Sequence, residues 1–393
     1  MMKKLLYMML AFPAAFLFLG VVSCDRDNEQ FVGETFLENA QADEQDTAPP
    51  PTSQQIPSPT TSPEQTPAFT PAPLEPIPVF GFMDAHADTI SRAFVLEPNN
   101  RSLYDNDALH IDFRRLSEFE APMQFFALWT ADRFVADVFN HTNQMIDFFK
   151  EQVEAHNDII EIARDLDDIL RIARSGRVSA ILTIEGGEAL MGDIENLYHF
   201  YNRGVRSIGI LWNRENELGF GWPQGRTQGL KPFGFEVIKK MEELGIILDV
   251  SHLNEAGFWD AHNASARPYI ASHSNAYAIT PHGRNLTDDQ IMAIVESGGI
   301  IGFNMFPSFV STNNFATMDD IMAHFRHFIE LGAGENIALG ADFDGITSTP
   351  QGITDVLSLK DVNQQLIAEF GESVALDIME RNFLNFLKRY FAT

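Results

Sequence analysis

Histidines and carboxylates stand at the ends of several short apolar runs in this sequence, where they could together hold metal ions. In His86-x-Asp88 the two side chains are two positions apart, so they point the same way from an extended strand. Imidazole and carboxylate ligands suit zinc, with manganese, cobalt and iron as competitors. The only cysteine is Cys24, so a metal site in the folded part must use nitrogen and oxygen ligands. The other candidate ligands are Glu185, His252 and His273.

Each of these residues has an ordinary explanation when it is taken alone. A histidine at a strand end is more often a hydrogen-bonded structural residue than a ligand, and His-x-Asp is common by chance. Five such residues at predicted strand ends are harder to explain, because burying unpaired ions costs several kcal/mol for each of them. A pair of divalent cations would neutralise this charge, so the set predicts a metal site.

Eight apolar runs alternate with helical patterns between residues 79 and 393. Runs of this kind indicate buried parallel strands joined by crossovers. We therefore predict an α/β fold, a (β/α)8 TIM-like barrel of the metal-dependent hydrolase type, with an open doubly wound sheet as the alternative. In such a barrel the carboxyl ends of the strands meet at one face. The predicted strands are 79–84, 123–129, 179–184, 205–211, 245–250, 269–272, 300–305 and 337–341, and the predicted helices include 144–174, 235–244, 287–297 and 319–331.

The first 78 residues differ in composition from the rest of the chain. Residues 1–23 place Lys3 and Lys4 ahead of an apolar run that leads to Cys24, which resembles a bacterial lipoprotein signal with lipidation at that cysteine. An uncleaved signal anchor is the alternative. Residues 24–78 are acidic and rich in Pro, Thr and Ser, which predicts a disordered stalk. We therefore expect residues 79–393 to form an extracytoplasmic domain anchored to a membrane.

Six motifs follow one another along this domain. They are, in chain order, His86-x-Asp88, Glu185-Gly-Gly, Asp249-Val-Ser-His252, Ser272-His273-Ser274, Arg284-Asn285 and Gly340-Ala-Asp-Phe-Asp-Gly345. Together they resemble the membrane dipeptidase (renal dipeptidase, peptidase M19) family of the amidohydrolase superfamily. The resemblance implies two zinc ions per chain, one bound by His86 and Asp88, the other by His252 and His273, with Glu185 bridging both. It also implies a homodimer that hydrolyses dipeptides, including those with a C-terminal D-residue.

The resemblance also assigns roles around the metal ions. Asp342 would take the proton from the attacking water, with Asp344 as a competitor that we expect to be a turn residue. Arg284 would pair with the free carboxylate of the dipeptide. The sequence departs from the family at Trp212, where the family has a histidine that binds the substrate or the oxyanion, because an indole cannot take a proton. The candidates for the missing donor are Asn213, Arg214 and Asn216.

Charge and motifs exclude other classes of protein. The chain has 27 Lys+Arg against 55 Asp+Glu, too few basic residues to neutralise a nucleic acid. It has no phosphate-cradling glycine loop and no Gly-x-Ser-x-Gly elbow. The alternatives that remain are another amidohydrolase activity, on a lactone, an amide or an N-acyl amino acid, and a surface binding lipoprotein. We expect His324 and His327 to lie on a solvated helix face rather than at a second metal site.

Overall fold

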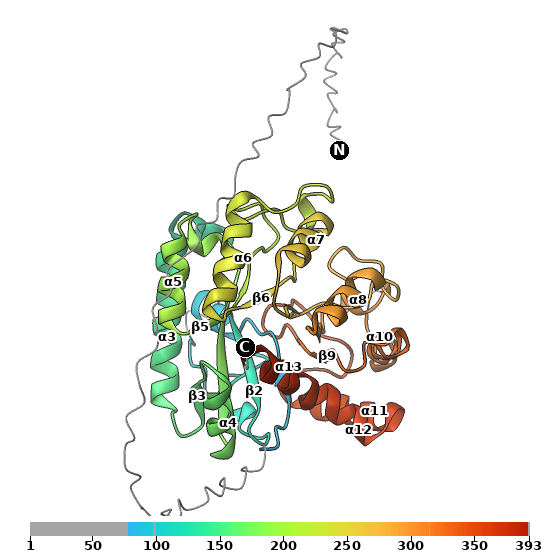
Figure 1. The fold of residues 1–393 in the computed structure, drawn as a ribbon. Coiled ribbons are helices and arrows are strands. Elements are labelled where there is room, and N and C mark those ends of the chain that lie inside the picture. Colours follow the sequence, from blue (N-terminus) through green and yellow to red (C-terminus); the bar gives the residue numbers. More distant parts are fainter. Residues whose placement is uncertain (1–77, 97–99, 314, 392–393) are drawn as a thin grey trace, which may run out of the picture. The chain divides into compact units, whose positions relative to one another are not determined.

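A closed barrel of eight parallel strands lies at the centre of the computed structural model, which describes residues 78–96, 100–313 and 315–391 (Figure 1). The strands pair in the order β1-β2-β4-β5-β6-β7-β8-β9, and β9 pairs with β1 to close the ring. The predicted (β/α)8 fold is therefore confirmed. The strands of the ring are β1 (Met83–Asp84), β2 (Met123–Trp129), β4 (Val178–Glu185), β5 (Val205–Gly209), β6 (Ile247–Asp249), β7 (Ile270–Ala271), β8 (Ile300–Phe303) and β9 (Ile337–Leu339).

A further strand, β3, lies where the sequence pattern predicted an unbroken helix over 144–174. Its Ile160 pairs with Val178 at the start of β4, ahead of the point where β5 joins the same strand. A strand of three residues is too short to show a period of its own, so the helical patterns on both sides concealed it. The three elements that replace the predicted helix are α3 (Val138–Ala155), β3 (Ile160–Ile162) and α4 (Leu166–Arg174).

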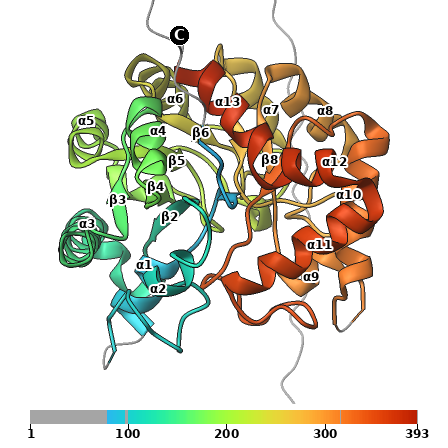
Figure 2. The same ribbon diagram turned by 90° about the horizontal axis from the view of Figure 1, so that it is seen from below.

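Helices surround the ring of strands (Figure 2). The helices predicted over 235–244, 287–297 and 319–331 are present as α6 (Pro232–Leu244), α8 (Asp288–Ser297) and α10 (Met318–Leu331). A capping box between Thr287 and Gln290 begins α8, so this end was readable from the sequence. The remaining α-helices of the described residues are α1 (Thr89–Ser91), α2 (Phe113–Leu116), α5 (Ile194–Arg203), α7 (Glu255–Ala264), α9 (Pro307–Val310), α11 (Leu359–Phe370), α12 (Glu372–Leu376) and α13 (Asn382–Phe391).

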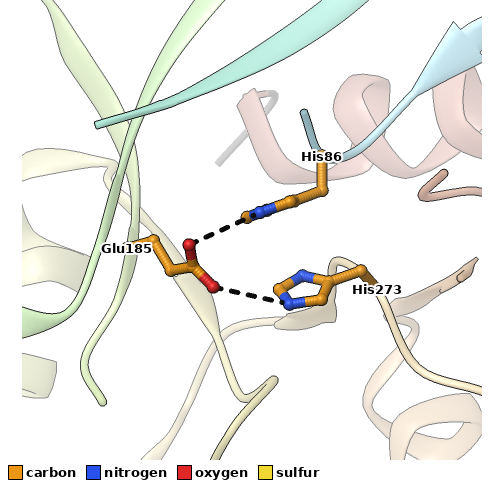
Figure 3. A group of neighbouring side chains, drawn as sticks. All are labelled: His86, Glu185 and His273. Carbon is orange, nitrogen blue, oxygen red and sulfur yellow. Dashed lines mark ion pairs between the residues drawn. The ribbon is translucent and has the colours of Figure 1, made fainter. Parts of the chain in front are cut away.

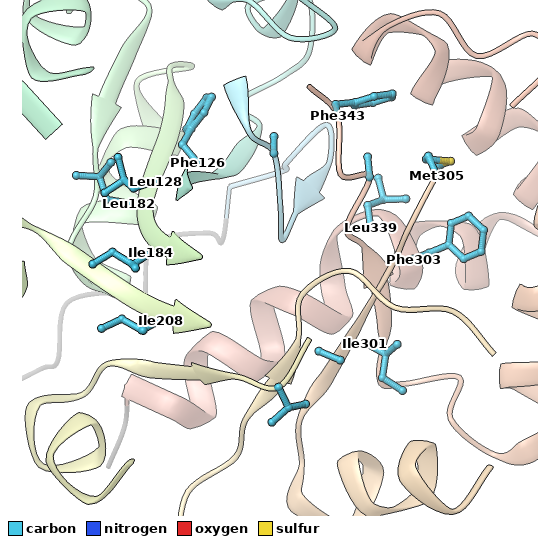
Figure 4. Packing of buried hydrophobic residues seen from close by; sticks show 14 of the residues in the cluster. Phe126, Leu128, Leu182, Ile184, Ile208, Ile301, Phe303, Met305, Leu339 and Phe343 are labelled. Atoms are coloured by element: carbon cyan, nitrogen blue, oxygen red, sulfur yellow. The ribbon is translucent and has the colours of Figure 1, made fainter. Parts of the chain in front are cut away.

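Alternate strand residues pack on the two faces of the barrel wall. Phe126, Leu182 and Ile208 belong to a large apolar cluster that also contains buried residues of the surrounding helices (Figure 4). Phe125 and Ile181, each one position away, belong to a second cluster with apolar residues of α13. This second cluster includes the residues that begin β6, β7 and β8, so α13 closes the amino end of the barrel. The predicted site therefore belongs to the opposite end of the barrel, where the carboxyl ends of the strands lie.

The predictions for the N-terminal segment concern residues that precede the barrel. The leader over 1–23, the lipidation site Cys24 and the stalk up to residue 77 lie outside the described residues. Within the part of the chain that the structure describes, no helix has both the length and the apolar character needed to span a bilayer.

Candidate active site

The residues predicted to bind metal meet at the carboxyl end of the barrel. Glu185 is the last residue of β4, and His86, His252 and His273 follow β1, β6 and β7 within three residues. These four side chains and that of Asp88 are buried. Figure 3 shows the Glu185 carboxylate between the rings of His86 and His273, with one oxygen directed to each. The structure thus brings together side chains that the sequence carries at separate strand ends.

The Glu185 carboxylate divides these side chains into two sets. Its Oε2 lies 3.7 Å from Nε2 of His86, and this nitrogen is 3.3 Å from Oδ2 of Asp88. Its Oε1 lies 2.9 Å from Nε2 of His252 and 3.6 Å from Nε2 of His273. One carboxylate therefore faces both sets of side chains.

Hydrogen bonds behind His252 determine which of its ring nitrogens faces the site. Its Nδ1 lies 2.9 Å from Oδ1 of Asn213, and the same oxygen accepts a hydrogen bond from Nε1 of Trp222 at 2.8 Å. An amide oxygen can only accept, so His252 donates from Nδ1 and turns the lone pair of Nε2 toward Glu185. Asn213, predicted as a candidate substrate donor, lines the cavity, and its oxygen positions His252.

The carboxylate of Asp249 and the hydroxyl of Ser272 likewise determine which ring nitrogen of His273 faces the site. Oγ of Ser272 donates to Oδ2 of Asp249 at 2.5 Å, and it accepts from Nδ1 of His273 at 2.7 Å. Asp249 is fixed in turn, because its Oδ1 accepts from the backbone amides of Ser251 and Ser272, both at 2.9 Å. The Nε2 lone pair of His273 therefore also faces the site.

The Nε2 lone pairs of His252 and His273 face each other, an arrangement that a nearby cation would stabilise. Nε2 of His252 and Nε2 of His273 are 2.8 Å apart. Burial, with the charges of His86 and Arg284, lowers the pKa of both rings well below the usual value, so both are neutral at pH 7. In addition, Oδ1 of Asp88 is buried and has no hydrogen-bond partner among the described residues. Facing lone pairs and an unsatisfied carboxylate oxygen fit a site for divalent cations.

Two carboxyl groups of the site bind a proton more readily than free carboxyl groups do. Burial, with the nearby charge of Asp88, raises the pKa of Glu185 to about 8 and that of Asp342 to about 7. Burial by itself lowers the pKa of His86. The negative charges of Glu185 and Asp88 raise this pKa by more than burial lowers it, so it lies well above its usual value. Because metal ligands must be deprotonated, a bound cation takes the place of these protons.

Asp342 and Asp344 have different contacts, although they are two positions apart in the sequence. Oδ1 of Asp342 lies 4.0 Å from Nε2 of His86, and its Oδ2 accepts a hydrogen bond from Nδ2 of Asn304 at 2.9 Å. Asp344 instead accepts a hydrogen bond from the Thr89 hydroxyl at 2.6 Å and another from the His110 amide at 2.6 Å. Asp344 thus links neighbouring loops, as expected of a turn residue, while Asp342 faces the candidate ligands.

A cavity of about 320 Å³ opens above these residues, at the small end of the range for ligand pockets. Arg284 lines it and is 5% exposed. Its guanidinium donates to the backbone oxygen of His273 at 3.2 Å, and it lies over the ring of Phe309 at 5.6 Å. Burial lowers the pKa of Arg284 to about 10, so it remains charged at neutral pH. Trp212 also lines the cavity.

One prediction about the remaining histidines is wrong. His324 does not lie on a solvated helix face, since it is fully buried. Its Nε2 donates to the Val310 oxygen at 2.9 Å, and its Nδ1 accepts from the Ala276 amide at 3.2 Å. Val310 ends α9 and Ala276 lies 48 residues before His324, so the pattern of α10 alone could not reveal these partners. His327 pairs with Asp288 at 2.8 Å.

We expect Ser272→Ala to weaken metal binding by about 10–100-fold, because the variant loses the hydroxyl that orients His273. Titration of the metal-free protein with zinc against a competing chelator measures the change. Ser207→Ala is the matched control, since its hydroxyl is buried and contacts the Ile247 oxygen at 3.2 Å in the barrel wall. Equal zinc affinity in Ser272→Ala and in the unmodified protein would contradict the role given to Ser272.

A family model and two related proteins match most of the described chain. Residues 77–391 match the family model described as membrane dipeptidase (peptidase family M19). Dipeptidase tcpJ of Claviceps purpurea is 31% identical over 260 residues, which cover 63% of this chain and 61% of that protein. An uncharacterized protein from the pqqA 5′ region of Klebsiella pneumoniae is 34% identical over 256 residues, covering 62% and 94% of the two chains.

Two solved metallopeptidase structures have a similar fold. The dipeptidase AC, a metallopeptidase of family M19, is 28% identical with a TM-score of 0.74, covering 80% of this chain and 100% of that one. A metallopeptidase from Rhodobacter sphaeroides, solved with a phosphinate mimic of the dipeptide L-Ala-D-Ala, is 28% identical with a TM-score of 0.72, covering 79% and 99%. The chain therefore belongs to the membrane dipeptidase family, peptidase family M19, and is a metallo-dipeptidase.

Proposed function

We propose that this protein hydrolyses dipeptides at a binuclear zinc site. His86 and Asp88 would hold one ion, His252 and His273 the other, and Glu185 both. The observation that supports this most strongly is that the two oxygens of Glu185 face different histidines. The donor set contains imidazole and carboxylate without thiolate, which suits zinc, with manganese, cobalt and iron as competitors.

The reaction needs a base for the attacking water and an acid for the departing amine. When bound, the two cations would make water nucleophilic at neutral pH and polarise the peptide carbonyl. Asp342 takes the proton from the water and returns it to the amine, since its carboxylate lies at the site beside His86. Asn304 holds Oδ2 of Asp342, which leaves Oδ1 directed toward the site.

The substrate is a dipeptide with a free C-terminal carboxylate. Arg284 lies in the cavity wall and is charged, and its planar guanidinium can bind a carboxylate through two hydrogen bonds. The relative from Rhodobacter sphaeroides, which was solved with a mimic of L-Ala-D-Ala, supports substrates with a C-terminal D-residue.

A substrate panel with and without metal tests this proposal. We expect the full chain, purified in detergent and loaded with zinc, to hydrolyse L-Ala-L-Ala and L-Ala-D-Ala. A chelator should abolish the activity and added zinc restore it. Faster turnover of a lactone or of N-acetylalanine would favour another amidohydrolase activity. A folded chain that binds no metal would favour a binding lipoprotein.

We also propose that Cys24 carries a lipid that anchors the protein outside the cytoplasm. The apolar run before this cysteine, and its being the only cysteine in the chain, support the proposal. Cys24→Ser should therefore shift the protein from the membrane fraction to the soluble fraction or block its processing. Cleavage and membrane retention unchanged in the variant would favour the uncleaved signal anchor.

Zinc should stabilise the protein more at pH 8 than at pH 6.5. The pKa values of Glu185 and Asp342 are raised in the fold, so the stability that their protonated forms contribute is lost as pH rises toward 8. The lowered pKa values of His252 and His273 act below the usual histidine value of 6.5, outside this window. Zinc replaces the lost protons. Melting temperatures with and without zinc measure the difference, and a zinc effect that shrinks with pH would contradict the assignment.

A further inference from the structure

Two tryptophans flank the bridging carboxylate. Trp129 is the last residue of β2 and pairs in register with Glu185 at the end of β4. On the other edge of β4, Glu185 pairs with Gly209, and Trp212 follows three residues later. The two indole rings meet edge to face, with centroids 5.1 Å apart and an interplanar angle of 63°. Both residues line the cavity above the candidate metal ligands.

The paired indoles form an apolar wall. Arg214 lies over the Trp212 ring at 5.4 Å, but its guanidinium already donates to Glu188 at 2.9 Å and to Asp132. Nε1 of Trp129 is buried and has no hydrogen-bond partner within the part of the chain that the structure describes. A charged side chain placed against the two indole rings would lose part of its hydration, whereas an apolar side chain would be buried favourably.

A different pair of aromatic rings lies beside Arg284. Phe309 lies under its guanidinium, and Phe306 contacts Phe309 with centroids 4.9 Å apart. If the substrate carboxylate binds Arg284, as the proposed function requires, the C-terminal residue lies near these two phenylalanines. The scissile bond lies over Glu185 and Asp342. The N-terminal residue then occupies the remaining part of the cavity, whose lining includes the paired indoles together with Ser91 and Arg92.

We propose that Trp129 and Trp212 together form the binding surface for the N-terminal side chain of the dipeptide and select large apolar side chains. The inference rests on the proposed dipeptide hydrolysis and adds the substrate class to it. The residue that departs from the family pattern, Trp212, thereby acts as a specificity determinant. It acts together with Trp129, which no sequence motif marked.

The test is a kinetic comparison of dipeptides that differ only at the N-terminal residue. We expect the zinc-loaded full chain to hydrolyse Phe-Ala with a kcat/KM at least about 10-fold above that for Gly-Ala, and to disfavour Glu-Ala and Lys-Ala. Trp129→Ala and Trp212→Ala should lower kcat/KM for Phe-Ala much more than for Gly-Ala, so that the ratio approaches one. Trp129→Phe and Trp212→Phe retain an apolar ring and should recover part of the preference.

Trp259→Phe is the matched control, because Trp259 packs on the outer helix α7 against Phe258 and should leave the Phe-Ala to Gly-Ala ratio unchanged. Circular dichroism of every variant establishes that it is folded, and the phenylalanine variants serve where an alanine variant does not fold. Equal losses for Phe-Ala and Gly-Ala, or no preference in the unmodified protein, would overturn the inference while the proposed function stands. Failure to hydrolyse any of the four dipeptides would instead overturn the proposed function.

Discussion

Glu185→Gln is expected to remove metal binding and dipeptide hydrolysis together. The amide has the size of the carboxylate, but it offers one neutral oxygen in place of two charged ones, so it cannot face both sets of ligands. The rate should fall by more than about 10²–10³-fold, the loss that removal of one oxyanion donor causes. Elemental analysis and rate measurements on the same sample measure both effects.

Glu188→Gln provides a matched control for this experiment. Glu188 is also buried, three residues further along, but it accepts hydrogen bonds from Arg214 at 2.9 Å and from Asn216 at 3.2 Å. We expect this variant to lose some stability and to keep its metal. A Glu185→Gln protein with full metal content and nearly unchanged turnover would show that Glu185 does not bridge two ions.

Asp342→Asn is expected to lower kcat by about 10²–10⁴-fold while the metal stays bound, since the variant loses only the proton-transferring group. Asp342 lies close to His86 and Asp88, but the amide keeps the size of the carboxylate, and Glu185 still faces His86 and His252 in the variant. KM should change less than kcat, because Arg284 still binds the substrate carboxylate. Steady-state kinetics together with metal analysis of the variant test this expectation.

Asp344→Asn distinguishes the two aspartates. Asp344 accepts hydrogen bonds from Thr89 and from the backbone of His110, and the amide variant weakens this network. We expect a loss of about 1–3 kcal/mol in the free energy of unfolding and a smaller loss in kcat than for Asp342→Asn. If Asp344→Asn lost more turnover than Asp342→Asn at equal metal content, the proton-transfer role would belong to Asp344.

The sequence predicted the parts of the site that follow directly from strand order. His86, Glu185, His252 and His273 each end or follow an apolar run, and parallel strands in a closed barrel bring their carboxyl ends to one face. The strand β3 escaped prediction, because its three residues lie between two strong helical patterns. The local sequence pattern was therefore enough to predict a strand or helix that was long, or a strand that a histidine or carboxylate followed.

The groups that position the ligands depend on contacts distant in sequence. Asn304 follows β8 without any motif, yet it holds Asp342 across a separation of 38 residues. Asn213 lines the cavity as predicted for a residue near the substrate, and its oxygen also accepts from His252 and Trp222, which the sequence did not indicate. No local pattern could indicate these partners, since the packing of separate loops at the barrel rim creates them.

The most direct test of the account is the metal content and metal positions of the full chain, purified in detergent and loaded with zinc. Elemental analysis should give about two zinc ions per chain, and anomalous diffraction should place both beside Glu185, one near His86 and the other near His252. A single ion, or zinc bound away from Glu185, would contradict the claim that this carboxylate joins two metal sites.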